Sequence, residues 1–223
     1  MKKDYFIKRF FILIYVLFFT STYAKEKIFI AYGETIKNKL HIPTNQLIST
    51  RWEISNNDEV YSGIGESIYD QEFKYPSIYH LKIIPNPIKF PHEHYDSCSL
   101  LHNPIEYEVI VSSVRMKFIF DELTFSKPLT GGKPLIDIAI QVPVIVETYN
   151  NKPFIYKDGN VNTAGVGTSI KGEIVDKKCK LKIGKNLLTY KLSGIAISGT
   201  YIMFDFNAAD GSIQSYSLTT PIL

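Results

Sequence analysis

The sequence of 223 residues carries 25 lysine and arginine residues against 22 aspartate and glutamate residues, a formal net charge of +3. The first 24 residues hold four bases and one acid, so the chain from Lys25 onward is neutral. A neutral chain lacks the basic footprint of nucleic-acid-binding proteins, and a 45% share of hydrophobic residues argues against disorder. We expect a folded protein with no nucleic acid partner.

Residues 1–24 have the three-part layout of a cleavable secretory signal peptide. A basic start precedes the apolar run at 10–19, and Thr22, Tyr23 and Ala24 form the cleavage site. The alternative, a membrane anchor, needs about 20 apolar residues, which is longer than this run. We expect export to the periplasm, a fimbrium or the cell surface, with a mature chain that begins near Lys25 and has no transmembrane span.

Alternating apolar and polar side chains dominate the mature chain, and no regular helical pattern is visible. The parity of the alternation changes at Ser112 and Ser113, which predicts a bulge or bend. Pro143 cannot donate to a strand ladder and predicts a sheet edge or bulge. Strands are expected at 27–32, 46–54, 77–84, 105–120, 134–149, 168–175, 178–183, 187–192, 195–206 and 212–218.

The clearest strand is 134–149, which we expect to pair antiparallel with 105–120 across a Gly- and Pro-rich turn. One of its faces would carry Ile136, Ile138, Ile140, Val142, Val144 and Val146. Many short strands with polar turns favour an all-β fold, an immunoglobulin-like antiparallel β-sandwich of one or two domains.

The segment 157–167 is rich in glycine and asparagine and is the best candidate linker. As a linker it would divide the region 25–223 into 25–160 and 165–223. The other interpretation is a long hairpin loop within a single sandwich.

Two cysteines are present, Cys98 and Cys179. In an exported chain an even number favours a disulfide, and closing a loop of about 80 residues contributes roughly 4 kcal/mol in the chain-entropy model. The alternative is two separate thiols in a chain that is never oxidised.

Histidines gather in one region, and His92 and His94 would lie on the same side of an extended strand. Imidazoles in this arrangement are ligands for zinc or copper. The candidate metal ligands are His80, His92, His94 and His102. The simpler interpretation is a solvated loop.

Aromatic residues are frequent between 52 and 95, mixed with polar residues. Exposed aromatic rings with polar tips suit carbohydrate or protein binding, whereas buried ones would be core. The candidate ligand-binding residues are Trp52, Tyr61, Tyr69, Tyr75, Tyr79 and Tyr95.

No activated serine or cysteine motif, phosphate-binding loop or catalytic carboxylate pair stands out in the sequence, so we do not expect an enzyme. A periplasmic metal-binding protein and an exported hydrolase or toxin subunit are the alternatives.

Residues 167–181 read GTSIKGEIVDKKCKL. The part from Lys171 to Leu181, a strand leading into Cys179, resembles the opening strand of bacterial chaperone–usher fimbrial subunits. The resemblance implies an incomplete immunoglobulin-like sandwich that assembles by donating a strand to a neighbour. In the family's two-domain tip adhesins the pilin domain comes second. The resemblance therefore predicts an exported surface or fimbria-associated adhesion protein, whose partners are envelope or fimbrial proteins and a host glycan or protein.

Overall fold

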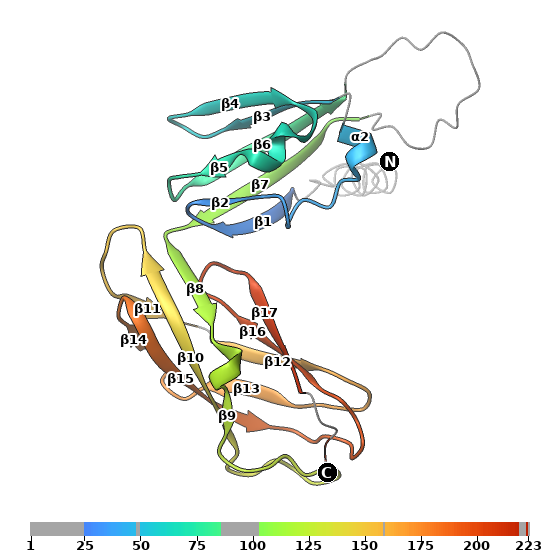
Figure 1. The fold of residues 1–223 in the computed structure, drawn as a ribbon, viewed down its shortest axis with the longest axis vertical. Helices are drawn as coiled ribbons and strands as arrows, with labels where there is room; N and C mark the ends of the chain where they lie inside the picture. Colours follow the sequence, from blue (N-terminus) through green and yellow to red (C-terminus); the bar gives the residue numbers. More distant parts are fainter. Residues whose placement is uncertain (1–24, 48–49, 86–102, 158, 219–221, 223) are drawn as a thin grey trace, which may run out of the picture.

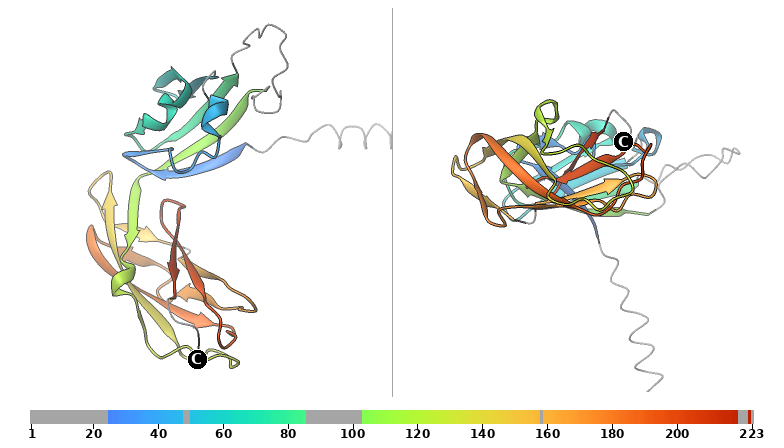
Figure 2. Two further views of the ribbon diagram at one scale, coloured as in Figure 1. Left: turned by 45° about the vertical axis from the view of Figure 1, so that its right-hand side comes forward. Right: turned by 90° about the horizontal axis from the view of Figure 1, so that it is seen from below.

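The computed structural model describes residues 25–47, 50–85, 103–157, 159–218 and 222. They form two β lobes, each with its own hydrophobic core, set at an angle to one another (Figure 1, Figure 2). The predicted all-β class is confirmed. The single α-helix of the described residues, α2 (Thr44–Leu47), is one turn long.

The first lobe is built on a five-stranded sheet with the order β1-β7-β6-β3-β4. β1 pairs with β7 in parallel, and the other neighbours are antiparallel. Apolar residues at every second position give this sheet one buried face. The strands are β1 (Glu26–Ala31), β3 (Thr50–Ser55), β4 (Val60–Ile64), β6 (Ile78–Pro85) and β7 (Ile105–Ser112).

Short elements supply the rest of the first core. These are α2, the 3-10 helix η1 (Gly65–Asp70), and a small ribbon of β2 (Glu34–Thr35) and β5 (Glu72–Phe73). Their apolar residues pack against the buried face of the sheet. The core residues are Ile28, Ile30, Ile36, Leu40, Ile42, Leu47, Trp52, Ile54, Ile68, Phe73, Tyr79, Leu81, Ile83, Tyr107, Val109 and Val111.

The opposite face of the first sheet is charged and open to solvent. Across it, Lys25 Nζ lies 2.7 Å from Glu106 Oε2, and Lys27 Nζ lies 3.2 Å from Glu108 Oε1. Such exposed ion pairs contribute only about 0–1 kcal/mol, so they mark a solvated surface rather than a source of stability.

β7 runs directly into β8 (Val114–Phe118), with only Ser113 between them. Buried positions are odd-numbered up to Val111 and even-numbered from Val114 onward. The bend predicted at Ser112 and Ser113 is therefore confirmed. It is also the point at which the chain leaves one sheet and enters the other (Figure 1).

The second lobe contains an eight-stranded antiparallel sheet with the order β17-β16-β12-β13-β15-β10-β8 and β9 paired to β10. This sheet is nearly closed, like a barrel, and is not clearly a sandwich. A separate ribbon joins β11 to β14. The strands are β9 (Thr124–Phe125), β10 (Ala139–Thr148), β11 (Phe154–Tyr156), β12 (Asn160–Ala164), β13 (Lys171–Ile174), β14 (Cys179–Leu181), β15 (Gly184–Ser193), β16 (Met203–Asn207) and β17 (Ile213–Ser217).

β10 is the strand that the alternation predicted most clearly, and it pairs antiparallel with β8, the second part of the expected partner 105–120. Ile140, Val142, Val144 and Val146 are fully buried. Ile136 was wrongly placed on this face, because the strand starts only at Ala139 and Ile136 is 71% exposed. Pro143 is tolerated inside β10 because two strands share that side of it. β9 pairs with 140–141 and β8 with 144–148, so the missing N–H of Pro143 lies between the two partner strands.

One side chain joins the two end strands of the second sheet. Gln214 on β17 accepts a hydrogen bond from the Phe118 N–H of β8 through Oε1 at 3.0 Å. Its Nε2 donates to the Met116 carbonyl of β8 at 2.6 Å. The amide of Gln214 therefore takes the place of a backbone ladder between β8 and β17.

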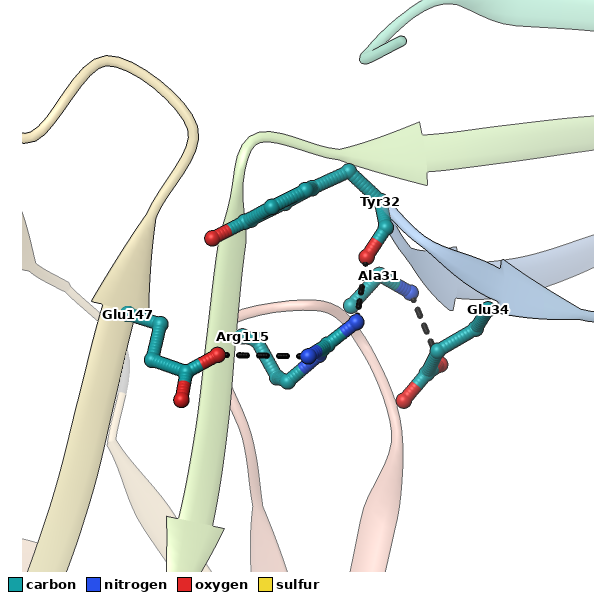
Figure 3. A network of polar contacts seen from close by, with 5 residues as sticks. All are labelled: Ala31, Tyr32, Glu34, Arg115 and Glu147. Atoms are coloured by element: carbon teal, nitrogen blue, oxygen red, sulfur yellow. Dashed lines mark hydrogen bonds and ion pairs between the residues drawn. The ribbon is translucent and has the colours of Figure 1, made fainter. Parts of the chain in front are cut away.

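Arg115 holds the two lobes together (Figure 3). Its Nη2 donates to the Tyr32 carbonyl of the first lobe at 2.7 Å, and its Nη1 lies 3.2 Å from Glu147 Oε2 on β10. The guanidinium also lies 5.3 Å from the centre of the Tyr32 ring, within cation–π range. A second contact is made by Gly211, in the β16–β17 turn, against the Phe29 ring.

Other predictions are confirmed in part. The strand expected at 195–206 begins only at Met203, and the one expected at 46–54 begins at Thr50, after the turn of α2. The boundary considered at 160–165 coincides with β12, which lies between β13 and β16 of one sheet.

Residues 1–24 lie outside the described residues, so the signal peptide stays a prediction. No helix within the described part of the chain has the length and apolar character needed to cross a membrane.

The Gln214 bridge gives a stability prediction. We expect Gln214→Leu to lower the free energy of unfolding by about 1–3 kcal/mol, because the Phe118 N–H and Met116 carbonyl lose their partner. Denaturant unfolding measures the change. Ser217→Ala, at an exposed position of the same strand, is the control and should change stability by less than about 0.5 kcal/mol. Equal stability of the two variants would contradict the role given to Gln214.

Candidate functional site

A polar hollow of about 370 Å³ lies on the first lobe. This volume falls within the range of small-molecule sites. We call it the Tyr69 pocket. It is lined by Lys37, Asn38, Thr44, Glu66, Tyr69 and Asp70.

The segment after β2 supplies one wall. The Ile36 carbonyl accepts hydrogen bonds from the N–H groups of Lys39 and Leu40, both at 2.9 Å, which close a turn. Ile36 and Leu40 are buried in the first core. Lys37 and Asn38, at the tip of the turn, are therefore left exposed at the pocket.

The opposite wall is η1, which follows β4. Ile68 is fully buried and anchors this helix to the core, whereas Glu66 and Asp70 are exposed. Gly65 starts the helix at φ +59°, a left-handed conformation that glycine adopts without strain. In each wall, buried apolar residues fix the backbone, and the polar residues beside them line the pocket.

Tyr69 links the two walls. Its hydroxyl donates to the Ile42 carbonyl at 3.0 Å, so the ring is held between η1 and the segment that leads into α2. Burial, and then the nearby Glu66 carboxylate, raise the pKa of Tyr69. The hydroxyl therefore remains protonated and keeps donating at neutral pH.

The lining combines one aromatic ring with a cation, an amide, a hydroxyl and two carboxylates. Carboxylates accept, ammonium donates, and amides do both, so the pocket pairs with a ligand that carries several hydroxyl groups. The ring offers an apolar face for the C–H surface of such a ligand. A second hollow of about 210 Å³, lined by Asn160, Glu173, Ile174 and Lys177, has no aromatic residue.

Two of the predicted ligand-binding aromatics are core residues. Trp52 is 5% exposed and donates its indole N–H to Ser67 Oγ at 3.1 Å. Tyr79 is 1% exposed and packs edge-on against Phe73. The prediction that both residues belong to a binding surface is wrong, because their strand positions face the buried side of the first sheet.

Tyr61 and Tyr79 share one carboxylate. Tyr61 donates to Glu59 Oε2 at 2.7 Å, and the Tyr79 hydroxyl lies 3.5 Å from the same atom. The hydrogen bond to Glu59, with burial next, raises the pKa of Tyr61 to about 12. Burial, followed by the charge of Glu59, raises the pKa of Tyr79 to about 12.

Tyr75 lies at the junction of the lobes. It is 48% exposed, and its ring meets that of Tyr149 edge-on at 6.2 Å, while Tyr149 meets Tyr32 at 5.6 Å. The predicted tyrosines are therefore distributed over the core, a carboxylate network, the junction and the Tyr69 pocket. Tyr95 lies outside the described residues.

The predicted metal ligands are only partly described. His80 is exposed on β6, directly opposite Glu108 of β7. His92, His94 and His102 lie outside the described residues. Among the residues that the structure does describe, no group of three or more metal-ligating side chains is present. The zinc or copper site stays a prediction.

Cys179 begins β14 opposite Tyr156 and is half-buried, with its thiol unbridged among the described residues. Burial, with the Asp176 carboxylate second, raises the pKa of the Cys179 thiol. This shift makes the thiol a poor nucleophile at neutral pH. Cys98 lies outside the described residues, so the Cys98–Cys179 disulfide stays a prediction.

Tyr69 was predicted from the sequence as a ligand-binding residue, whereas the other residues that line the pocket were not. Lys37, Asn38 and Thr44 precede it by at least 25 positions, and Glu66 and Asp70 sit in a helix too short for a periodic signal. The available signal was the spacing of Ile36 and Leu40, which is that of a turn with a polar tip.

The shared carboxylate gives a pH prediction. Because the pKa of Tyr61 is higher in the folded state, its contribution to stability is present below about pH 10 and is lost as the pH rises to about 12. In Glu59→Gln we expect the pKa of Tyr61 to fall toward about 10. Tyrosinate absorbance during alkaline titration, compared with Tyr61→Phe to assign the signal, measures it. An unchanged titration in Glu59→Gln would contradict the hydrogen bond.

The comparisons with known proteins add no identity. No protein-family model matches the chain, and no curated protein sequence matches it.

Proposed function

We propose that the chain is an exported, non-enzymatic binding protein of the bacterial cell surface or of a fimbrium, and that it holds its ligand in the Tyr69 pocket. The observation that carries the proposal is the lining of that pocket, with one fixed aromatic ring among six side chains that donate or accept hydrogen bonds. The ligand class that fits is a glycan.

The order of the lobes supports this proposal. The pocket lies in the first lobe, whereas the segment that resembles fimbrial subunits forms β13 and β14 of the second lobe, after β8 to β12 rather than at its start. In two-domain tip adhesins the binding domain likewise precedes the pilin domain. The first lobe then binds the ligand, and the second lobe attaches the protein to envelope or fimbrial partners.

An immunoglobulin-like origin of the second lobe is part of the same proposal. Its strands are antiparallel and surround a single core, as in that fold. In this chain the Gln214 bridge holds the two end strands close, which accounts for the barrel-like outline.

A glycan array with the protein from Lys25 onward tests the function. We expect binding to a subset of neutral or amino glycans, because two carboxylates against one lysine make the pocket weakly acidic. Glu66→Gln with Asp70→Asn should weaken binding at least about tenfold, because each charged hydrogen bond contributes roughly 1.5–3 kcal/mol. Both side chains are exposed, so the variant should fold normally.

Glu53→Gln is the matched control, since Glu53 is exposed on the open face of the first sheet. It should bind as well as the unmodified protein. Tyr69→Phe should keep the ring and most of the affinity. Absence of binding to every glycan, or equal binding by the double variant, would overturn the proposal.

A further inference from the structure

The two-stranded ribbon of the second lobe carries a local excess of positive charge. β11 and β14 pair only with each other and form this ribbon beside the larger sheet (Figure 1). Segments 150–158 and 174–185, which contain the two strands and their flanks, hold seven lysines and two aspartates. Their net charge is therefore +5, in a chain that is neutral from Lys25 onward.

Three of these lysines occupy alternate positions along β14. Lys180 lies within the strand, and Lys178 and Lys182 lie one residue beyond its two ends. All three are exposed, whereas Cys179 and Leu181 between them are half-buried and buried. Alternate side chains of an extended segment lie on one side of it, about 7 Å apart. The three lysines therefore form a row, which we call the lysine row.

The backbone of the lysine row is held at both ends. At the first end, the Lys178 N–H donates to Asp176 Oδ1 at 3.1 Å. At the other end, Asn186 accepts from the Lys182 N–H at 3.0 Å and donates to the Lys182 carbonyl at 2.7 Å. Leu181 is buried in the second core between these ends. Binding would therefore have to order only the lysine side chains, which keeps its entropic cost low.

The carboxylates of the second lobe do not neutralise the lysine row. Lys185, the next lysine along the chain, is paired, because its Nζ lies 2.6 Å from Glu122 Oε2. By contrast, no carboxylate of the described residues is within ion-pair distance of the lysine row. The nearby Asp176 accepts from a backbone N–H instead. The row thus presents uncompensated positive charge to the solvent.

We propose that the lysine row binds a linear polysaccharide that carries carboxylate or sulfate groups and lies along β14. An extended polyanion matches a straight row of point charges. The flexible stem of lysine lets each ammonium meet an acidic group without a fixed spacing. The two segments contain no arginine, whose planar fork is the side chain best suited to bidentate recognition of phosphate.

Two other kinds of polyanion fit the ribbon less well. Single-stranded nucleic acid is held by aromatic rings on which its bases stack, but Phe154 and Tyr156 of β11 pack into the second core. An anionic bilayer presents a plane of charge. The unpaired positive charge on β14 is instead a single row, which is followed along the chain by the paired Lys185 and Glu122.

The lysine row and the Tyr69 pocket are separate surfaces on different lobes. The pocket has two carboxylates against one lysine and suits neutral or amino glycans, whereas the row suits acidic ones. The lysine row therefore does not depend on the function proposed for the pocket. Glu66→Gln with Asp70→Asn should leave binding at the row unchanged.

Fluorescence anisotropy with labelled heparin and the protein from Lys25 onward tests the proposal. Polygalacturonate, which carries carboxylates alone, is the second probe, and dextran is the uncharged one. We expect binding to heparin and polygalacturonate but not to dextran. Raising the salt concentration from about 50 mM to about 200 mM should weaken heparin binding at least about tenfold, because each paired ammonium releases a counterion.

The variant that tests the site combines Lys178→Gln, Lys180→Gln and Lys182→Gln. It should weaken heparin binding at least about tenfold at about 50 mM salt, because it removes the whole row of charge. The three side chains are exposed, so the variant should fold normally, and its circular dichroism spectrum checks this.

The matched control combines Lys127→Gln, Lys133→Gln and Lys171→Gln. It removes the same charge from exposed positions of the second lobe outside the ribbon. This control should bind heparin like the unmodified protein.

Three results would contradict the lysine row as a polysaccharide site. The first is an absence of binding to both acidic polysaccharides. The second is an equal loss of binding in the two triple variants, which would reduce the effect to overall charge. The third is displacement of heparin by double-stranded DNA or phosphatidylglycerol vesicles at an equal concentration of negative charge, which would assign the row to a nucleic acid or a membrane.

Discussion

The arrangement of the molecule depends on the chain passing from one sheet to the other through a single residue, Ser113. A strand that is paired with β1 up to Ser112 and with β10 again from Val114 has almost no free backbone torsion between the two ladders. The two lobes are therefore neighbours because of covalent geometry, before any side chain contributes. Arg115 comes two residues later, where a long side chain on β8 reaches back to the Tyr32 carbonyl.

The side-chain contacts between the two lobes hold them in a fixed orientation rather than allowing them to rotate about a hinge. Arg115 has a carbonyl, a carboxylate and an aromatic face as partners, and the first and last of these belong to the first lobe. Tyr149 adds ring contacts to Tyr32 and Tyr75. The contact of Gly211 with Phe29 lies on another strand pair, so the lobes meet at two places rather than about one hinge.

Local periodicity predicted most strands but not how they are grouped. The alternation of 105–120 and the parity change at Ser112 were visible in the sequence, yet a bend within one sheet and a passage between two sheets give the same local pattern. The sequence did not predict the Tyr69 pocket for a related reason, since its two walls meet through tertiary contacts such as that of Tyr69 with Ile42. Ile136 was misplaced because the alternating apolar pattern begins before Ala139, the residue at which the pairing of β10 starts.

The parallel pairing of β1 with β7 has a consequence for the order of folding. Ile28 and Ile30 are completed as core residues only by Val109 and Val111, about 80 positions later. A chain that emerges from its amino end, whether from a ribosome or through a translocation channel, must wait until nearly half its length has appeared before β1 finds its partner. During that interval the apolar side of β1 has no native cover from β7, and a holding factor that shields a short extended segment would act at this stage.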